Sequence, residues 1–167
     1  CEEIAVSYLR SEKIETAKGR VRGKISFHIG VTNENADEIC RLVREGDPQS
    51  GLNPEDIAGV KVFMGSSTGN MLVDSDSTLD KIFSIREKPV LVHCEDEATI
   101  KSNLNEAVQK YGEDIPFREH ENIRSRKACI KSSIKALELA ISHQTSMVLC
   151  HISTKESVEL IRKAKAE

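Results

Sequence analysis

The spacing of apolar residues alternates along the chain between a two-residue and a three-to-four-residue period. Residues 24–31, Lys-Ile-Ser-Phe-His-Ile-Gly-Val, alternate apolar and polar side chains, which predicts a strand. Apolar runs predict further strands over 60–64, 89–94 and 146–151. Helical spacing predicts helices over 2–18, 36–45, 77–87, 98–111, 125–142 and 155–166. The pattern therefore indicates four strand-then-helix units.

Apolar strands joined by helices are typical of a parallel sheet that is covered by helices. Two architectures satisfy this pattern: an open doubly wound sheet, and part of a (β/α)8 barrel. Both place their functional sites at the carboxyl ends of the strands. The chain contains neither G-x-G-x-x-G nor G-x-x-x-x-G-K-[ST], so a nucleotide-binding loop finds no support.

Composition narrows the class of protein. The 167 residues suffice for roughly one domain, and the net charge of −3 argues against a nucleic-acid or anionic-membrane surface. No apolar run approaches the roughly 20 residues that a membrane-spanning helix needs, and the first residues do not resemble a signal peptide. The five cysteines are odd in number and lack C-x-x-C spacing, which argues against a disulfide framework. We therefore expect a cytoplasmic protein.

Polar residues interrupt or end three successive predicted strands. Lys61 lies inside the run 60–64, His93 ends Leu-Val-His, and His151 ends Leu-Cys-His. A buried lysine is costly unless it is paired or neutral, and a neutral amine can add carbon dioxide to form a carbamate. Imidazoles at the ends of neighbouring parallel strands would converge, and imidazole is a good zinc ligand. These residues predict a metal site, although a solvated edge lysine and two hydrogen-bonded core histidines explain them as well.

Other polar residues have simpler structural interpretations. His28 could face the barrel interior, but we expect it to pack in the core or against a helix, and we expect Cys94 and Cys150 to point toward the helices. Glu95 and Asp96 could support His93, or they could cap the next helix.

The region between the third and fourth strands adds two candidates. His120 and Arg124 could reach the mouth of a site, and a solvated helix start is the simpler interpretation. The loop over residues 66–70 could contact substrate or be a plain surface loop.

Several of these segments resemble the dihydroorotase family. Residues 59–72, Gly-Val-Lys-Val-Phe-Met-Gly-Ser-Ser-Thr-Gly-Asn-Met-Leu, resemble its carboxylated-lysine strand and loop. Residues 90–96, Val-Leu-Val-His-Cys-Glu-Asp, and 149–156, Leu-Cys-His-Ile-Ser-Thr-Lys-Glu, resemble two following strands that each supply a histidine ligand. Residues 120–124, His-Glu-Asn-Ile-Arg, with Ala128 and Cys129, resemble the segment between those strands.

The resemblance implies a TIM-type (β/α)8 metal-dependent hydrolase barrel. Lys61 would be a carbamate that bridges two zinc ions, and His93 and His151 would be ligands of one of them. The implied reaction is the reversible hydrolysis of dihydroorotate to N-carbamoyl-aspartate in pyrimidine biosynthesis. Dihydropyrimidinase and allantoinase are related alternatives, and a truncated module without catalytic activity is an alternative of another class.

The resemblance also implies ligands that this chain lacks. The family has a His-x-His pair on its first barrel strand and an aspartate, ligand and general acid/base, on its last, and no histidine here forms such a pair. Because a full barrel needs about 250 residues, residues 1–167 are expected to be its central part, strands three to six of eight. We therefore expect an incomplete site with no catalytic aspartate and no identified substrate-binding residue, and a homo-oligomer stays open.

Overall fold

The computed structural model describes residues 13, 15–17, 19–23, 25–65 and 71–166 of the chain. Strands alternate with helices, which confirms the predicted α/β class. The helix predicted over 2–18 lies largely outside the described residues. The elements are β1 (Phe27–Gly30), α2 (Ala36–Glu45), η1 (Pro54–Asp56), β2 (Ile57–Phe63), α3 (Asp76–Phe83), β3 (Val90–His93), α4 (Glu97–Tyr111), η2 (Phe117–Glu119), α5 (His120–Ile123), α6 (Arg126–His143), β4 (Met147–Leu149) and α7 (Lys155–Ala164).

The four strands form one parallel sheet in the order β1-β2-β3-β4. Lys61 of β2 is paired with Gly30 of β1 and with Leu91 of β3, and Phe63 is paired with His93. A doubly wound sheet reverses its strand order at a switch point, whereas the described strands advance in one direction. This order favours the barrel interpretation over the doubly wound one.

The two faces of the sheet differ in burial. Side chains alternate between the faces along each strand, and one set is fully packed: Ile29, Val60, Val62, Val90 and Val92 are all at most 2% exposed. The opposite set is partly or fully exposed and contains His28, Lys61, Phe63, Leu91, His93 and Val148. We call this second set the open face of the sheet.

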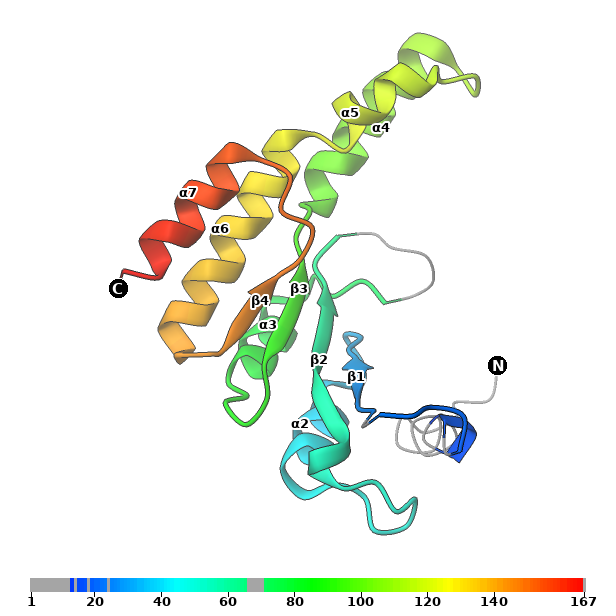
Figure 1. The fold of residues 1–167 in the computed structure, drawn as a ribbon. Helices are drawn as coiled ribbons and strands as arrows, with labels where there is room; N and C mark the ends of the chain where they lie inside the picture. The colour runs from blue at the N-terminus through cyan, green and yellow to red at the C-terminus, as the bar shows by residue number, and fades with distance from the viewer. Residues whose placement is uncertain (1–12, 14, 18, 24, 66–70, 167) are drawn as a thin grey trace.

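Helices α2, α3 and α6 supply the apolar side chains that bury the packed face (Figure 1). Each begins where the sequence offers a suitable start: Ser75 and Ser125 cap α3 and α6, and acidic residues open α2. The side chains shared with the sheet are those at helical spacing: Ile39, Leu42 and Val43 of α2, Leu79, Ile82 and Phe83 of α3, and Ala136 and Ala140 of α6.

The segment between β3 and β4 is longer than a simple crossover. Helix α4 buries only Ile100 and Ala107, and with α5 it projects from the end of the sheet (Figure 1). Helix α6 is the one that returns along the sheet to β4. No helix within the described ranges is both long and apolar enough to cross a membrane.

Several predicted boundaries are wrong, beginning with β1, which covers Phe27–Gly30 of the strand predicted over 24–31. Strand β2 begins at Ile57, three residues before the predicted start at residue 60. Its first residues pair with β1, but Ala58 and Gly59 give too weak an apolar pattern to predict a strand. Helix α3 ends at Phe83, although Ile85 beyond it is also buried. Strand β4 stops at Leu149, and His151 just beyond it has a left-handed φ of 56°.

Two phenylalanines provide a matched test of this core. Phe83 is 0% exposed, whereas Phe117 is 92% exposed. We predict that Phe83→Ala lowers the free energy of unfolding by about 3–5 kcal/mol, because it leaves a cavity beneath the sheet. Phe117→Ala is expected to change it by less than about 0.5 kcal/mol. Urea denaturation of both variants checks this, and equal effects would contradict the described packing.

Candidate metal-binding site on the open face of the sheet

Lys61 lies half-buried in the middle of the open face. Its Nζ is 3.5 Å from the carbonyl oxygen of Val62, 4.3 Å from the ring centroid of Phe63 and 4.0 Å from Sγ of Cys150. Burial lowers the pKa of Lys61, and the nearby thiols of Cys150 and Cys94 oppose this only in part. The environment therefore raises the fraction of neutral amine, which is the form that reacts with carbon dioxide.

The two histidines come from adjacent strands and meet. His93 is the last residue of β3, and its ring centroid lies 6.0 Å from that of Phe63. His151 follows β4, and its ring lies edge-on to His93 with centroids 5.3 Å apart. Lys61 lies near these rings, because its Nζ contacts the ring of Phe63 and Sγ of Cys150.

The three predicted ligands thus share one region of the open face. In the described part of the chain, no three His, Cys, Asp or Glu side chains are arranged to hold a metal ion. A site in this region therefore needs a donor of another kind, and a Lys61 carbamate would be one. That these residues bind a metal stays a prediction.

Glu95 is a buried carboxylate next to His93. Its Oε2 is 2.9 Å from Nε2 of His93, and Arg124 donates from Nε to Oε1 at 3.1 Å and from Nη2 to Oε2. Burial raises the pKa of Glu95, but the hydrogen bonds and charges of His93 and Arg124 outweigh it and hold the pKa at about 2. Glu95 raises the pKa of Arg124 in turn. The carboxylate is therefore ionised and can only accept hydrogen bonds.

The sequence left the roles of Glu95, Asp96 and Arg124 open. Asp96 is the cap of α4, since it accepts a hydrogen bond from the Thr99 backbone at 3.0 Å. Glu95 orients toward His93 instead, and the expectation that Arg124 is a solvated helix start is wrong. The sequence signal for Glu95 was a charged residue two positions after a strand-end histidine. Arg124 gave no such signal, because it is 29 positions from Glu95 and only the fold brings the two together.

Other expectations are settled residue by residue. His28 is exposed on the open face beside Gly59, so the predicted core packing is wrong. Cys94 is buried in the core toward the helices, as expected, and burial raises the pKa of its thiol to about 12. Cys150 points toward Lys61 instead, because β4 keeps its alternation up to that residue.

Two remaining candidates lie away from this region or outside the description. His120 is exposed and stacks on Phe117, with ring centroids 6.1 Å apart, as expected of a solvated helix start. Residues 66–70 lie outside the described residues.

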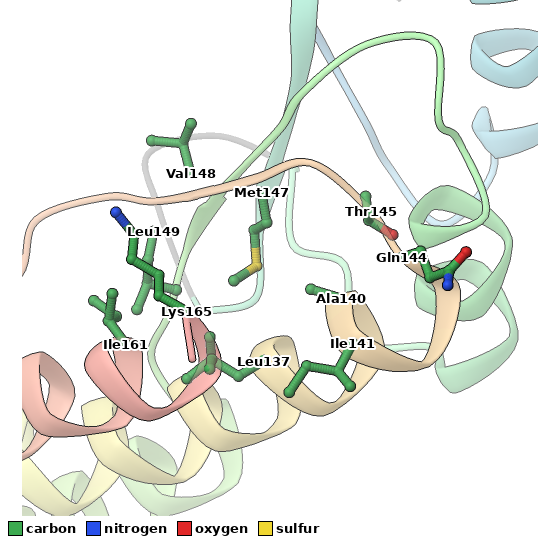
Figure 2. Close-up of a pocket in the computed structure, with 11 residues that line it drawn as sticks. Leu137, Ala140, Ile141, Gln144, Thr145, Met147, Val148, Leu149, Ile161 and Lys165 are labelled. Atoms are coloured by element: carbon green, nitrogen blue, oxygen red, sulfur yellow. The ribbon is translucent and has the colours of Figure 1, made fainter. Parts of the chain in front are cut away.

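An apolar cavity of about 640 Å³ lies beside β4, between α6 and α7 (Figure 2). Met147 and Leu149 point into it from the strand, and Val148 points to the opposite side. Leu137 and Ile141 of α6 and Ile161 of α7 complete its apolar lining. It contains none of the proposed ligands, and it follows the edge of β4 that has no partner strand in the described sheet.

Comparison with known proteins was made on sequence and on structure. No family model matches the chain. A dihydroorotase from Methanosarcina acetivorans is 29% identical over 92% of this chain and 30% of its own length. A dihydroorotase from Methanosphaera stadtmanae is 31% identical over 65% of this chain and 24% of its own length. The chain thus spans less than a third of the length of these relatives.

Solved structures match over nearly the whole chain. An L-hydantoinase from Arthrobacter aurescens superposes with a TM-score of 0.76, at 23% identity over 93% of this chain and 33% of its own. A dihydropyrimidinase from Brevibacillus agri superposes with a TM-score of 0.75, at 21% identity over 99% of this chain and 34% of its own. At this identity the likeness concerns the fold, and it confirms that the four units match the barrel region of such enzymes.

The charge pair of Arg124 and Glu95 can be tested by its contribution to stability. Glu95 is 7% exposed, so Arg124→Met leaves an uncompensated buried carboxylate. We predict a loss of about 2–3 kcal/mol, less than for a fully buried pair because solvent reaches Arg124. Arg126→Met, which breaks an exposed pair with Glu156, should cost about 0–1 kcal/mol.

Urea denaturation near neutral pH measures both variants. The double variant Glu95→Gln with Arg124→Met should recover part of the loss, since it removes the unpaired charge. Equal stability of the Arg124 and Arg126 variants would refute the buried pair.

Proposed function

Because this chain is related to the cyclic amidohydrolases of the dihydroorotase and hydantoinase group, we propose that it is the central third of a dihydroorotase. The intact enzyme would interconvert dihydroorotate and N-carbamoyl-aspartate. One observation carries this proposal: Lys61, His93 and His151, which lie far apart in the sequence, share one region of the open face. Lys61 lies within β2, His93 ends β3 and His151 follows β4.

The relationship confirms the resemblance drawn from the sequence motifs at the level of this group. The choice of dihydroorotate as substrate rests on sequence. The two relatives named dihydroorotase share 29% and 31% identity with the chain, whereas the two hydantoin- or dihydropyrimidine-cleaving structures share 23% and 21%. Because the chain spans less than a third of those relatives, the activity of the whole protein belongs to the proposal.

The residues present fit zinc in their chemistry. His93 and His151 would supply imidazole nitrogens, and Lys61, as a carbamate, would supply oxygens to two ions. When bound, zinc supplies a water of lowered pKa and polarises an amide carbonyl. The His-x-His pair and the aspartate that the resemblance implies would come from other parts of the intact protein.

The surroundings of Lys61 and His93 suit the roles proposed for them. The lowered pKa of Lys61 raises the fraction of neutral amine, whose nitrogen attacks carbon dioxide to form an N–C bond with loss of one proton. The Nζ of Lys61 lies over the ring of Phe63, 4.3 Å from its centroid. His93 is bonded to Glu95 through Nε2, so Nδ1 is the ring nitrogen that would reach a metal.

The apolar cavity beside β4 agrees with a continuation of the barrel. A further strand paired with β4 and a helix packed beside α7 would cover Met147 and Leu149. Without that cover the cavity is an exposed apolar surface, which also agrees with the alternative of a non-catalytic module that associates through this edge.

Substrate assays on the intact protein test the proposed reaction. We expect turnover of dihydroorotate that is abolished by a metal chelator and restored by zinc. Turnover of hydantoins or dihydropyrimidines without turnover of dihydroorotate would assign the chain to the related alternative. The absence of turnover on all three, in a protein that holds zinc, would favour the non-catalytic module.

The carbamate can be detected directly. In the intact protein supplied with ¹³C-bicarbonate, we expect a carbamate carbon signal that disappears in Lys61→Ala and persists in Lys101→Ala, a control on the exposed face of α4. Zinc content measured by atomic emission should fall in Lys61→Ala alone. A metal-free wild-type protein with an unmodified Lys61 would overturn the proposed site.

A further inference from the structure

Glu95 and Arg124 form a connected unit with His93, and a strand-end histidine does not need such a unit merely to pack. The carboxylate bridges the two side chains: one oxygen lies 2.9 Å from Nε2 of His93, and both oxygens accept from the Arg124 guanidinium. Glu95 is only 7% exposed, so this geometry is held in a poorly hydrated environment. Such a pair costs desolvation energy that packing alone does not require.

We propose that Glu95, held by Arg124, is a positioning residue that keeps His93 in its Nε2–H form and so leaves Nδ1 for a metal ion. This inference rests on the proposed function, because it assigns residues that serve its metal site. The proton assignment follows from the geometry: both oxygens of Glu95 already accept from the Arg124 guanidinium, so Glu95 is the acceptor and Nε2 of His93 donates to it. A hydrogen bond from the distal ring nitrogen fixes both the tautomer and the ring orientation of a ligand histidine.

Gly65 keeps Glu95 in place from the side of β2. A Cβ at residue 65 would lie 2.6 Å from Cβ of Glu95 and 2.7 Å from its carbonyl oxygen, which is closer than real contacts allow. The backbone of the segment after β2 therefore packs directly against Glu95. Gly65→Ala should displace Glu95 without any change of charge.

Asn103 of α4 holds the loop that presents Arg124. Its Nδ2 donates to the carbonyl oxygens of Asn122 and Ile123, each at 3.0 Å, and to Oγ of Ser125 at 3.2 Å. These contacts flank Arg124 on both sides in the sequence. The projecting α4–α5 segment thus has a role in the site, because it places the guanidinium of Arg124 next to the buried carboxylate of Glu95.

The tautomer of His93 is the direct readout of the proposal. In the intact protein without metal at pH 8, long-range ¹H–¹⁵N NMR should show His93 with a protonated Nε2 and an unprotonated Nδ1. Glu95→Gln should give a mixture of tautomers, because the neutral amide can donate as well as accept. Gly65→Ala should act in the same direction. Glu159→Gln, on the exposed face of α7, is the control and should resemble the wild type.

Zinc titration of the intact protein measures the consequence for the site. Glu95→Gln should weaken zinc binding roughly 10–100-fold, the range expected when the partner of a ligand histidine is lost. Arg124→Lys should give a smaller loss, because it keeps the charge but not the two-pronged hydrogen bonding. Asn103→Ala should also be intermediate, and circular dichroism verifies that each variant is folded.

The outcomes separate this inference from the proposed function. If His151→Ala weakens zinc binding and Glu95→Gln leaves both the affinity and the His93 tautomer unchanged, the positioning role is overturned and the metal site stands. If His151→Ala and Lys61→Ala have no effect on zinc binding, the proposed function fails. In that case, a change of the His93 tautomer in Glu95→Gln would still show that Glu95 orients His93. His93 would then not be oriented as a metal ligand.

Discussion

One-sided burial of the parallel sheet is the constraint on which the rest of the structure depends. Helices α2, α3 and α6 cover one face, so every second strand residue is apolar and packed. The residues between them face away from the helices and need not be apolar, and they include lysine, histidine and phenylalanine. The strand period that builds the core therefore also selects which side chains can meet on the open face.

A buried carboxylate imposes the second constraint. Glu95 lies two residues after the end of β3, and the hydrogen bonds and charges of His93 and Arg124 lower its pKa. The pair couples the end of the strand to a loop that is reached only through α4 and α5. This coupling gives the third unit a use for α4 and α5 in addition to α6: α6 covers the sheet, while the α4–α5 segment brings a cation to the strand end.

Much of the fold could be predicted because it is encoded by local periodicity. The bounds of α2 agree with the sequence pattern to the residue, since Ile39, Leu42 and Val43 mark its buried stripe. The strands around Lys61 and His93 were recognisable for the same reason. Boundaries failed where small residues, such as Ala58 and Gly59, extend a strand without an apolar signal. The predicted core packing of His28 was wrong because alternation indicates which residues share a face of the sheet but not which face the helices cover.

The sequence by itself determined the four units, the parallel sheet and the candidates Lys61, His93 and His151, because strand periodicity and strand ends are local properties of the chain. Only the tertiary structure decided that the rings of His93 and His151 meet, that Cys150 lies toward Lys61, and that Arg124 pairs with Glu95. Those contacts join residues from 29 to 89 positions apart. They depend on strand register and on the path of the α4–α5 segment, which packing between elements settles rather than any local pattern.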